Sequence, residues 1–320
     1  MSFMTVYETL EDDLAVIEEK IEEVLISSSP TLQNSAVHYL RSGGKRLRPM
    51  LVLLCAKYGD DRKTVIKNVA CALELIHMAS LIHDDVIDDA ETRRGRMTVK
   101  EKWDNKVAMY TGDYILAKSL ELLTQLEDPE AHKLFAHTMV QLSIGEIEQI
   151  RDKYNFNQPI IAYFRRIKRK TALLIAACCK LGAMAAGCDR NVAETLYRFG
   201  YYAGMAFQIT DDILDFVATE KTLGKPAGED LLQGNITLPV FFALRNEQLK
   251  RQIMQVHGQM ERQELEEVIR AIKASGAIKQ AYAVCEYYIK RAEEMIDKLP
   301  AHPVNSYLRK ILQFIAKRDH

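Results

Sequence analysis

Two aspartate clusters in this chain share one spacing, in which two adjacent carboxylates are followed by a third one three residues later. The first cluster is Asp84, Asp85 and Asp88, and the second is Asp211, Asp212 and Asp215. Residues four apart share one face of a helix, so the outer carboxylates of each cluster would project in one direction. Such oxygen ligands suit Mg²⁺, which keeps several waters and is often shared with substrate phosphates. The spacing therefore predicts two facing helices that hold Mg²⁺ against a diphosphate.

A solvated helix face can carry a similar acidic cluster, because like charges four residues apart are only mildly destabilising. The flanking sequence separates the two interpretations. Mostly apolar residues precede both clusters, at 78–82 and 205–209, where a surface helix would carry polar ones. The repetition of one pattern in apolar surroundings favours the metal site.

A basic run follows a pair of glycines in the segment GGKRLRP, residues 43–49. Gly43-Gly44 can adopt the positive φ of a chain reversal, and Pro49 fits the first turn of the next helix. Helix N-termini favour anions, and Lys45 and Arg48 add direct charge. A run of this kind is also typical of solvated surface. Beside two acidic clusters, it predicts a second diphosphate site that does not use metal.

Three more polar residues accompany the first cluster. Arg93 and Arg94 follow it by about one turn and would reach the same anions. A basic helix end that complements the macrodipole would give the same pattern. His77 precedes Asp84 by seven residues, about two turns along the same helix face. We expect all three side chains at the predicted site.

Lys170 and Thr171 lie where a basic run meets an apolar one. The run 163–171 resembles a nucleic-acid patch, but it leads directly into the apolar segment 172–179. Gln208 lies within the apolar sequence one turn before the second cluster, and a buried amide needs a hydrogen-bond partner. These three residues are further candidates for the site.

The composition is that of an all-α protein with an extensive core. Hydrophobic residues make up 48% of the 320 residues, and there are only 15 glycines and 8 prolines. Lysine and arginine number 43 against 44 acidic residues, so the charge gives no reason to expect a nucleic-acid partner. The six cysteines form no CxxC motif, which indicates reduced thiols. The N-terminus has no secretory signal, and the most apolar stretch, 172–179, is too short to cross a membrane. We expect a cytoplasmic protein with at most peripheral membrane contact.

Long amphipathic stretches predict one helical domain over residues 1–320. The expected helices lie at about 7–25, before Gly43, 50–58, 63–89, 103–126, 130–154, 159–186, 191–218, from 238, and at 262–275, 277–297 and 303–316. The aspartate clusters fall near the C-terminal ends of 63–89 and 191–218. The segment 222–234, which is rich in glycine and charge, is expected to form a functional loop.

In this order, the motifs GGKRLRP, DDVIDDAETRRG, KT, FQ and DDILD resemble those of the trans-isoprenyl diphosphate synthases. The resemblance covers residues 38–240, and it is strongest to the catalytic large subunits of two-component bacterial enzymes with C35 or C30 products. It implies an isoprenoid-synthase-type helical bundle around a central cavity. In that fold the two aspartate motifs face each other across the mouth of the cavity.

The resemblance also implies a role for each candidate residue. The diphosphate of isopentenyl diphosphate would be held by Lys45, Arg48, His77 and Arg94. The allylic diphosphate would contact Arg93, Lys170 and Lys225, and up to three Mg²⁺ would bridge it to Asp84, Asp88 and Asp211. The shell would be completed or oriented by Asp85, Asp212 and Asp215, and the reacting carbons lined by Thr171 and Gln208. Asn235 stands where many relatives have a second phosphate-binding lysine, which leaves Lys225 as the main cation of its loop.

The implied reaction adds isopentenyl diphosphate to an allylic diphosphate such as farnesyl diphosphate. Cations would stabilise the departing pyrophosphate, and the double bond would attack the allylic cation in a dry site. A proton would then be lost, and the resemblance implies the released pyrophosphate as the base. The product would be an all-trans polyprenyl diphosphate, used for a menaquinone side chain. Because the product is so apolar, we expect a smaller non-catalytic subunit as a partner of this chain. A homodimer is the alternative.

Ala79 and Ser80 bear on the length of the product. They lie one turn before Asp84, where short-chain relatives have bulky aromatic residues. Small side chains leave this passage open. One helix turn is about 5.4 Å, roughly the reach of one isoprene unit. We therefore expect products longer than C20, of about C30–C35.

Three other functions share some of these features. A class I terpene cyclase also uses DDxxD and Mg²⁺, but it needs only one diphosphate site. An HD-type metal phosphohydrolase is suggested by His83-Asp84, but it requires further histidine ligands that the sequence does not convincingly supply. A non-catalytic regulatory subunit would have no need of two intact acidic motifs.

Overall fold

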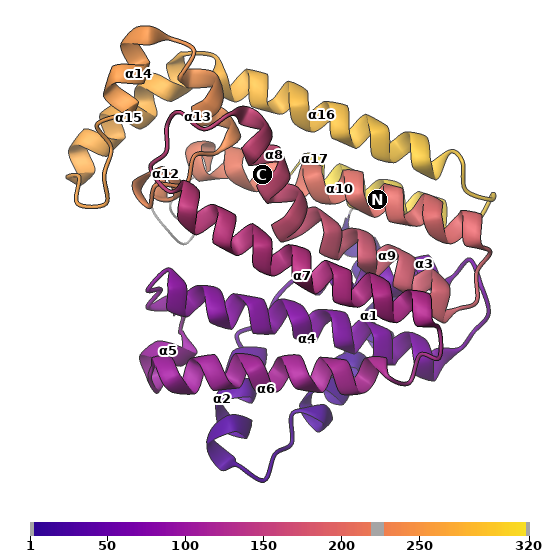
Figure 1. The fold of residues 1–320 in the computed structure, drawn as a ribbon. Helices are drawn as coiled ribbons and strands as arrows, with labels where there is room; N and C mark the ends of the chain where they lie inside the picture. Colours follow the sequence, from indigo (N-terminus) through magenta and orange to yellow (C-terminus); the bar gives the residue numbers. More distant parts are fainter. Residues whose placement is uncertain (1–2, 219–226, 318–320) are drawn as a thin grey trace. The chain divides into compact units, whose positions relative to one another are not determined.

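The computed structural model describes residues 3–218 and 227–317, and helices dominate these ranges (Figure 1). Contacts between residues divide the chain into two compact units. The first unit comprises Met1–Leu134, Cys178–Glu194 and His302–Tyr307, and the second Phe135–Ala177, Thr195–Ala301 and Leu308–His320. The first aspartate motif lies in the first unit, and the second motif lies in the second.

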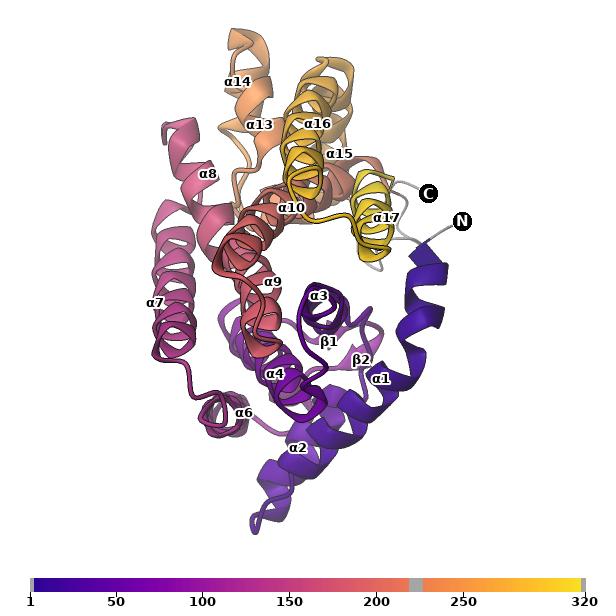
Figure 2. The ribbon, with the colours of Figure 1, turned by 90° about the vertical axis from the view of Figure 1, so that its right-hand side faces the viewer.

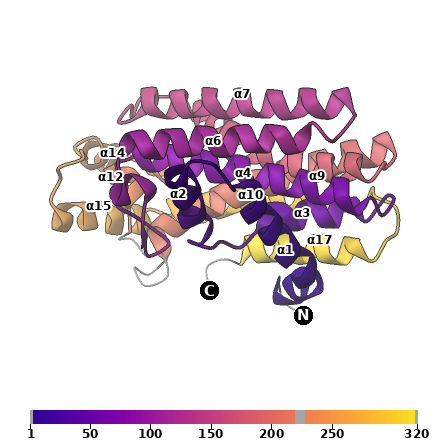
Figure 3. The same ribbon diagram turned by 90° about the horizontal axis from the view of Figure 1, so that it is seen from below.

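The first unit contains most of the N-terminal helices. These are α1 (Phe3–Val24), α2 (Pro30–Leu40), α3 (Leu47–Ala56), α4 (Lys63–Ile87), α5 (Val99–Lys102) and α6 (Asn105–Leu123). Helix α4 contacts all five of the others and packs most extensively on α6, beside which it runs in Figure 1. Figure 2 shows α3 close to α1 and α4, and Figure 3 shows α2 against α6.

Helix α4 forms the core of this unit because its sequence has neither glycine nor proline and is rich in apolar residues. It is also long and apolar enough to cross a membrane by length and composition. However, 72% of its apolar window is buried inside the fold, as expected for a core helix. From the sequence, only the apolar stretch 172–179 was considered as a possible membrane span. Helix α4, which carries charged residues at both ends, was not considered.

A tight hairpin follows α4. Strands β1 (Thr92–Arg93) and β2 (Arg96–Met97) are antiparallel, with Arg93 opposite Arg96. The two residues between them, Arg94 and Gly95, both have positive φ, at 53° and 73°. Positive φ at both central residues is the requirement of a type I′ turn. This turn fixes the direction in which Arg93 and Arg94 leave the backbone.

The second unit holds most of the remaining helices. The helices of the C-terminal half of the chain are α7 (Pro129–Asp152), α8 (Ile160–Ile167), α9 (Leu173–Ala185), α10 (Arg190–Val217), α12 (Glu229–Leu232), α13 (Leu238–Ala243), α14 (Glu247–Ile253), α15 (Arg262–Ala274), α16 (Ala277–Ile296) and α17 (Val304–Ala316). Unit boundaries fall within α7, α9, α10 and α17. Within the second unit, α13 packs on α8, α15 and α16 (Figure 1).

The all-α class is confirmed, and most helix bounds agree with the expected ones within a few residues. The main difference lies in the helix expected at 159–186, which contains a π-helical turn, η1 (Lys168–Ala172), between α8 and α9. The hairpin was not expected, because two-residue strands are too short for an alternating pattern. A single domain over 1–320 stays a prediction.

Candidate functional site

The first aspartate motif lies at the C-terminal end of α4. Asp88 ends the helix, and its N–H donates to the carbonyl of Asp84 at 2.8 Å. Asp84 and Asp88 are partly exposed, whereas Asp85 is 1% exposed, so the outer two share a face as the spacing predicted. The C-terminal end of a helix is the negative end of its dipole. Three carboxylates at this end favour a bound cation.

Asp85 is tied to the hairpin that follows α4. Arg93 Nε donates to Asp85 Oδ1 at 2.7 Å. The other oxygen, Oδ2, is buried and accepts no hydrogen bond from any residue that the structure describes. Burial raises the pKa of Asp85 above its usual value, and the Arg93 guanidinium opposes this shift. Asp85 therefore positions Arg93 beside the partly exposed carboxylates.

The two arginines of the basic run have different surroundings. Arg46 has a left-handed backbone conformation, with φ of 48°, and is 7% exposed. Its guanidinium donates to Glu18 at 2.6 Å and to Glu74 at 3.1 Å. Ion pairs with two carboxylates occupy Arg46, so its role is structural. Its absence from the predicted site agrees with this geometry.

Arg48 lacks such compensation. Its Nε is buried and has no hydrogen-bond partner within residues 3–218 and 227–317. Burial lowers the pKa of its guanidinium, while the Glu74 carboxylate acts in the opposite direction. A buried N–H of a cation without a hydrogen-bond partner is costly until it meets an acceptor. Arg48 is therefore suited to an anionic ligand.

Arg94 is placed by the two glycines. Its Nη1 donates to the carbonyl of Gly43. A Cβ at Gly44 would lie 2.7 Å from the same nitrogen, closer than such atoms approach. A side chain at this position would therefore displace the guanidinium from its place over the turn. Lys45 is exposed beside it, at the start of α3.

His77 lies among these cations on α4. Burial lowers the pKa of His77 well below 6.5, and the neighbouring guanidiniums of Arg48, Arg94, Arg93 and Arg46 lower it further. The imidazole is therefore neutral at physiological pH. A neutral imidazole can donate one hydrogen bond to a phosphate oxygen without adding a fifth positive charge.

Tyr39 belongs to the same group, although the sequence argument did not single it out. Its hydroxyl is buried and has no partner among the described side chains and backbone groups. Burial raises the pKa of Tyr39, and Arg93 opposes the shift. The first unit thus brings Arg48, His77, Arg93 and Arg94 together around unsatisfied donors.

The second aspartate motif lies near the C-terminal end of α10. Asp211 is partly exposed, whereas Asp212 and Asp215 are 4% and 1% exposed. Asp212 accepts from Tyr163 Oη at 2.7 Å and from Gln208 Nε2 at 2.9 Å. Burial raises the pKa of Asp212 to about 8, and the two hydrogen bonds act against this shift. Both oxygens of Asp212 are therefore committed to side chains of the protein.

Gln208 extends this network to the π-helical turn. Its Oε1 accepts from Thr171 Oγ1 at 2.6 Å. A π turn inserts one residue into a helix and often marks a functional position. Thr171 and Lys170 both lie in this turn.

Lys170 is held from α7. Its Nζ lies 2.7 Å from Glu146 Oε2 and donates to Gln149 Oε1 at 2.9 Å. Gly145 allows this approach, because a Cβ there would lie 3.1 Å from Lys170 Cγ. An ammonium has three protons, so one remains for a ligand.

Asp215 contacts the segment that begins at Ala227. Asp215 Oδ2 accepts from Asp230 N at 3.3 Å, and its carbonyl accepts from Gly228 N at 2.8 Å. Asn235 N donates to the carbonyl of Asp230 at 2.8 Å. The predicted ligand Lys225 lies outside the described residues.

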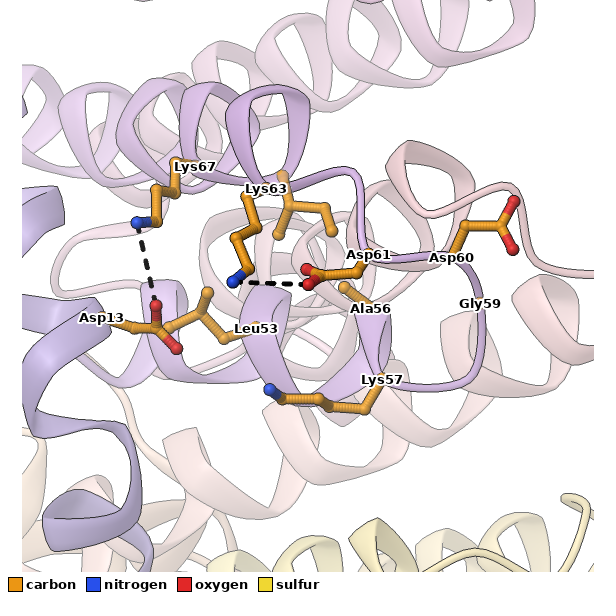
Figure 4. A pocket seen from close by; sticks show the side chains of 10 residues that line it. Asp13, Leu53, Ala56, Lys57, Gly59, Asp60, Asp61, Lys63 and Lys67 are labelled. Atoms are coloured by element: carbon orange, nitrogen blue, oxygen red, sulfur yellow. Dashed lines mark ion pairs between the residues drawn. The ribbon is translucent and has the colours of Figure 1, made fainter.

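One surface pocket, of about 320 Å³, lies at the opposite end of α4 from Asp84 (Figure 4). Its charged lining residues are Asp13, Lys57, Asp60, Asp61, Lys63 and Lys67. Lys63 and Lys67 pair with Asp61 and Asp13 at 3.4 and 3.8 Å. Equal numbers of acids and bases give this pocket no preference for a diphosphate, and it contains none of the predicted site residues.

The polyprenyl synthetase family model matches residues 29–274 of the chain. The chain belongs to the polyprenyl synthetase family. It is 52% identical to heptaprenyl diphosphate synthase component 2 of Bacillus subtilis (strain 168), covering 99% of this chain and 91% of that protein. It is also 52% identical to the protein of the same name from Geobacillus stearothermophilus, covering the full length of both.

A solved structure supports the same relationship. The heptaprenyl diphosphate synthase from Staphylococcus aureus matches with a TM-score of 0.93 and 41% identity, over 97% of this chain and 99% of that one. The resemblance stated from the motifs, including its subgroup, is confirmed. The isoprenoid-synthase type of helical fold is confirmed with it.

The donor set of this polyprenyl synthetase fits Mg²⁺ shared with a substrate. No group of three or more histidine, cysteine or acidic side chains could hold a metal ion on its own in the described parts of the chain. Mg²⁺ keeps waters and takes phosphate oxygens, so one or two carboxylates of a motif suffice. Asp84 and Asp88 at the end of α4, and Asp211 at the end of α10, suit this role.

Sequence reasoning missed several residues that surround the predicted ones. They are Tyr39, Glu74, Glu146, Gln149 and Tyr163. Only Tyr163 carried a usable signal, because it lies seven residues before Lys170 and so two helical turns away. The contacts of the others join helices that are distant in sequence.

Proposed function

We propose that this polyprenyl synthetase makes a long all-trans polyprenyl diphosphate, of about C30–C35, by condensing isopentenyl diphosphate with an allylic diphosphate. Farnesyl diphosphate is the proposed primer, and a menaquinone side chain the proposed use. One observation carries the two-substrate reaction. A cationic cluster at Arg48, His77 and Arg94 adjoins the first acidic motif, so one diphosphate can bind without metal. A terpene cyclase would need no such site.

The cationic cluster would bind the diphosphate of isopentenyl diphosphate. Lys45 and Arg48 supply charge at the start of α3, and Arg94 supplies it from the hairpin. The buried Nε of Arg48 would gain the partner that no described residue provides. His77 would donate a hydrogen bond as a neutral group, which limits repulsion among the cations.

The acidic motifs would bind the allylic diphosphate through metal. Bound Mg²⁺ neutralises charge that develops on the leaving pyrophosphate. Asp84, Asp88 and Asp211 would be its main ligands. Asp85 would hold Arg93 toward the same anion. Asp212 and Asp215 would complete or orient this ligand set.

Three residues of the second unit would act near the reacting carbons. Lys170 would donate a hydrogen bond to the allylic diphosphate through its remaining N–H, with Lys225 as a further cation. Thr171 and Gln208 would present oxygen atoms to the allylic cation. Their hydrogen bonds to each other and to Asp212 support a fixed orientation. Preorganised dipoles of this kind stabilise developing charge.

The length of the product would depend on α4. Ala79 is 2% exposed, and Ser80 is partly exposed and donates to the carbonyl of His77 at 2.9 Å. Both are small, so they would leave a passage one turn before Asp84 open to the growing chain. The names of the relatives, heptaprenyl diphosphate synthase, support a product in this range.

A smaller non-catalytic subunit would assist this chain in the cytoplasm. The relatives are named component 2, which supports a two-component enzyme. A homodimer is the alternative assembly.

Mass analysis of reaction products tests the proposed function. The purified chain is incubated with farnesyl diphosphate, labelled isopentenyl diphosphate and Mg²⁺, with and without the small subunit of a related two-component enzyme. We expect labelled polyprenyl diphosphates of about C30–C35. Unlabelled cyclic hydrocarbons would instead indicate a cyclase.

A further inference from the structure

We propose that Tyr163 is a positioning residue that fixes the orientation of Gln208 and Thr171 through Asp212. This inference rests on the proposed function, in which Thr171 and Gln208 line the reacting carbons. The four side chains form one continuous hydrogen-bonded chain, which we call the relay. Its members are Tyr163, Asp212, Gln208 and Thr171.

Tyr163 anchors the buried end of the relay. Its side chain is 0% exposed, and its ring packs against Phe164 and Phe241 at centroid distances of 5.2 and 5.9 Å. The Arg166 guanidinium lies 5.8 Å from the ring centroid and donates to the carbonyl of Ile236 at 2.6 Å. These contacts hold the ring, so the hydroxyl has one direction in which to donate.

Asp212 fixes the direction of every other hydrogen bond in the relay. Its Oδ2 accepts from Tyr163, and its Oδ1 accepts the amide N–H of Gln208. This orientation turns the amide oxygen of Gln208 toward Thr171. An amide oxygen only accepts, so Thr171 donates its one hydroxyl proton to Gln208.

The consequence concerns the oxygen of Thr171. Because its only proton is used in the relay, both of its lone pairs remain for other partners. An oxygen that presents lone pairs and no O–H stabilises an allylic cation through its dipole. The interaction matters after the cation begins to form, so it should act on kcat more than on KM.

Without the Tyr163 hydroxyl, the hydrogen bonds of the relay would no longer have fixed directions. Asp212 Oδ2 would be left buried without its donor, which is costly and favours rotation of the carboxylate. That rotation frees the amide of Gln208 to rotate as well. Thr171 could then point its proton toward the reacting carbons.

Substitution of Tyr163 by Phe tests the relay. We expect kcat to fall by about 10- to 100-fold, the usual cost of removing an outer hydrogen-bond partner, with KM for both substrates within about threefold. We also expect more capture of the allylic cation by water, which converts the allylic diphosphate and water into the allylic alcohol and pyrophosphate. Tyr201→Phe is the matched control, since it removes a hydroxyl from α10 outside the relay. Its kcat should stay near the wild-type value.

A double variant separates a relay from simple packing. If Tyr163 acts through Thr171, then Tyr163→Phe combined with Thr171→Val should be no slower than Thr171→Val alone, within about twofold. Thr171→Ser keeps the hydroxyl and should keep most of the activity. If Tyr163→Phe does not fold, Gln208→Glu breaks the same relay, because a carboxylate cannot donate to Asp212, and the same loss of kcat is expected.

Two results would overturn the inference. One is a kcat for Tyr163→Phe that matches the Tyr201→Phe control, and the other is multiplication of the two single losses in the double variant. If the wild-type enzyme is active, either result refutes only the inference about the relay. If the wild-type enzyme and the control are both inactive, the proposed function is refuted, and the catalytic role of the relay with it.

Discussion

At the scale of single residues, the cationic cluster of the first unit is prepared for an anion before one binds. Arg46 forms ion pairs with Glu18 and Glu74, whereas Arg48 has a buried Nε with no hydrogen-bond partner in the described chain. His77 stays neutral among four guanidiniums. Arg48 and His77 would each gain a hydrogen bond when a diphosphate binds. This gain is the physical basis of the proposed substrate site.

Arg48→Lys should weaken binding of isopentenyl diphosphate. A lysine offers a point charge and cannot reproduce the donor geometry of the guanidinium. A hydrogen bond to a charged group contributes about 1.5–3 kcal/mol, so KM for isopentenyl diphosphate should rise at least about tenfold. The KM for the allylic substrate should change little. Steady-state kinetics with each substrate varied in turn measure both values.

Arg46→Lys is the matched control for this prediction. Because Arg46 is buried in ion pairs, its loss should lower the melting temperature rather than raise KM. Equal rises in KM for the two variants would contradict the assignment of Arg48.

Acidification should destabilise the wild-type protein through His77. Its pKa is well below 6.5 in the folded chain and near 6.5 in the unfolded one. Between these two values the unfolded chain binds a proton that the folded chain does not. The free energy of unfolding therefore falls as pH drops below about 6.5, with a slope of at most about 1.4 kcal/mol per pH unit. Urea unfolding at several pH values measures this slope.

His77→Gln should remove that contribution. The variant should lose less stability than the wild type between about pH 7 and pH 5. Parallel pH profiles for the two proteins would show that His77 is not shielded from protons in the folded state.

At the scale of elements, short irregular segments orient several of the predicted site residues. The glycine pair before α3 and the type I′ turn after α4 together place Arg94, and the π-helical turn places Lys170 and Thr171. These segments set the direction of functional groups, while the helices supply the rigid support.

Gly44→Ala should damage the cationic site more than Gly43→Ala. Both glycines have positive φ, so either alanine costs about 1–2 kcal/mol of stability. A Cβ at Gly44 would meet the Arg94 guanidinium, whereas a Cβ at Gly43 meets nothing within 4 Å. Only Gly44→Ala should raise KM for isopentenyl diphosphate. Similar KM values for the two variants would contradict the role of the turn.

Ala79→Phe should shorten the product. An aromatic side chain one turn before Asp84 would close the passage along α4, and products of about C15–C20 are expected. Ser80→Ala keeps the position small and should leave the length unchanged. Mass analysis of the products compares the two variants, and an unchanged spectrum for Ala79→Phe would refute this geometry.

The helices were largely predictable from sequence, whereas the assignment of the site residues stays a prediction. Periodic apolar residues gave the helix bounds, and charged motifs named Asp84, Arg48 and Lys170 as candidates. The π turn was not predictable, because a single inserted residue leaves the apolar pattern of 159–186 almost unchanged. Neither was Tyr163 singled out, since its role depends on a contact with α10, 49 residues away.

At the scale of the whole molecule, the acidic and the basic side chains of the predicted site lie on different elements. Carboxylates lie at the C-terminal ends of α4 and α10, where the helix dipoles favour cations. Cations lie in the basic run and the hairpin of the first unit. One substrate diphosphate would bind through metal and the other through the protein's own cations.

The reaction itself tests this division most directly. Incorporation of labelled isopentenyl diphosphate into farnesyl diphosphate is measured with Mg²⁺, after chelation, and after Mg²⁺ is restored. We expect labelled chains of about C30–C35 with Mg²⁺, none after chelation, and full recovery on restoration. Label-free products, or incorporation that chelation leaves unchanged, would contradict the account.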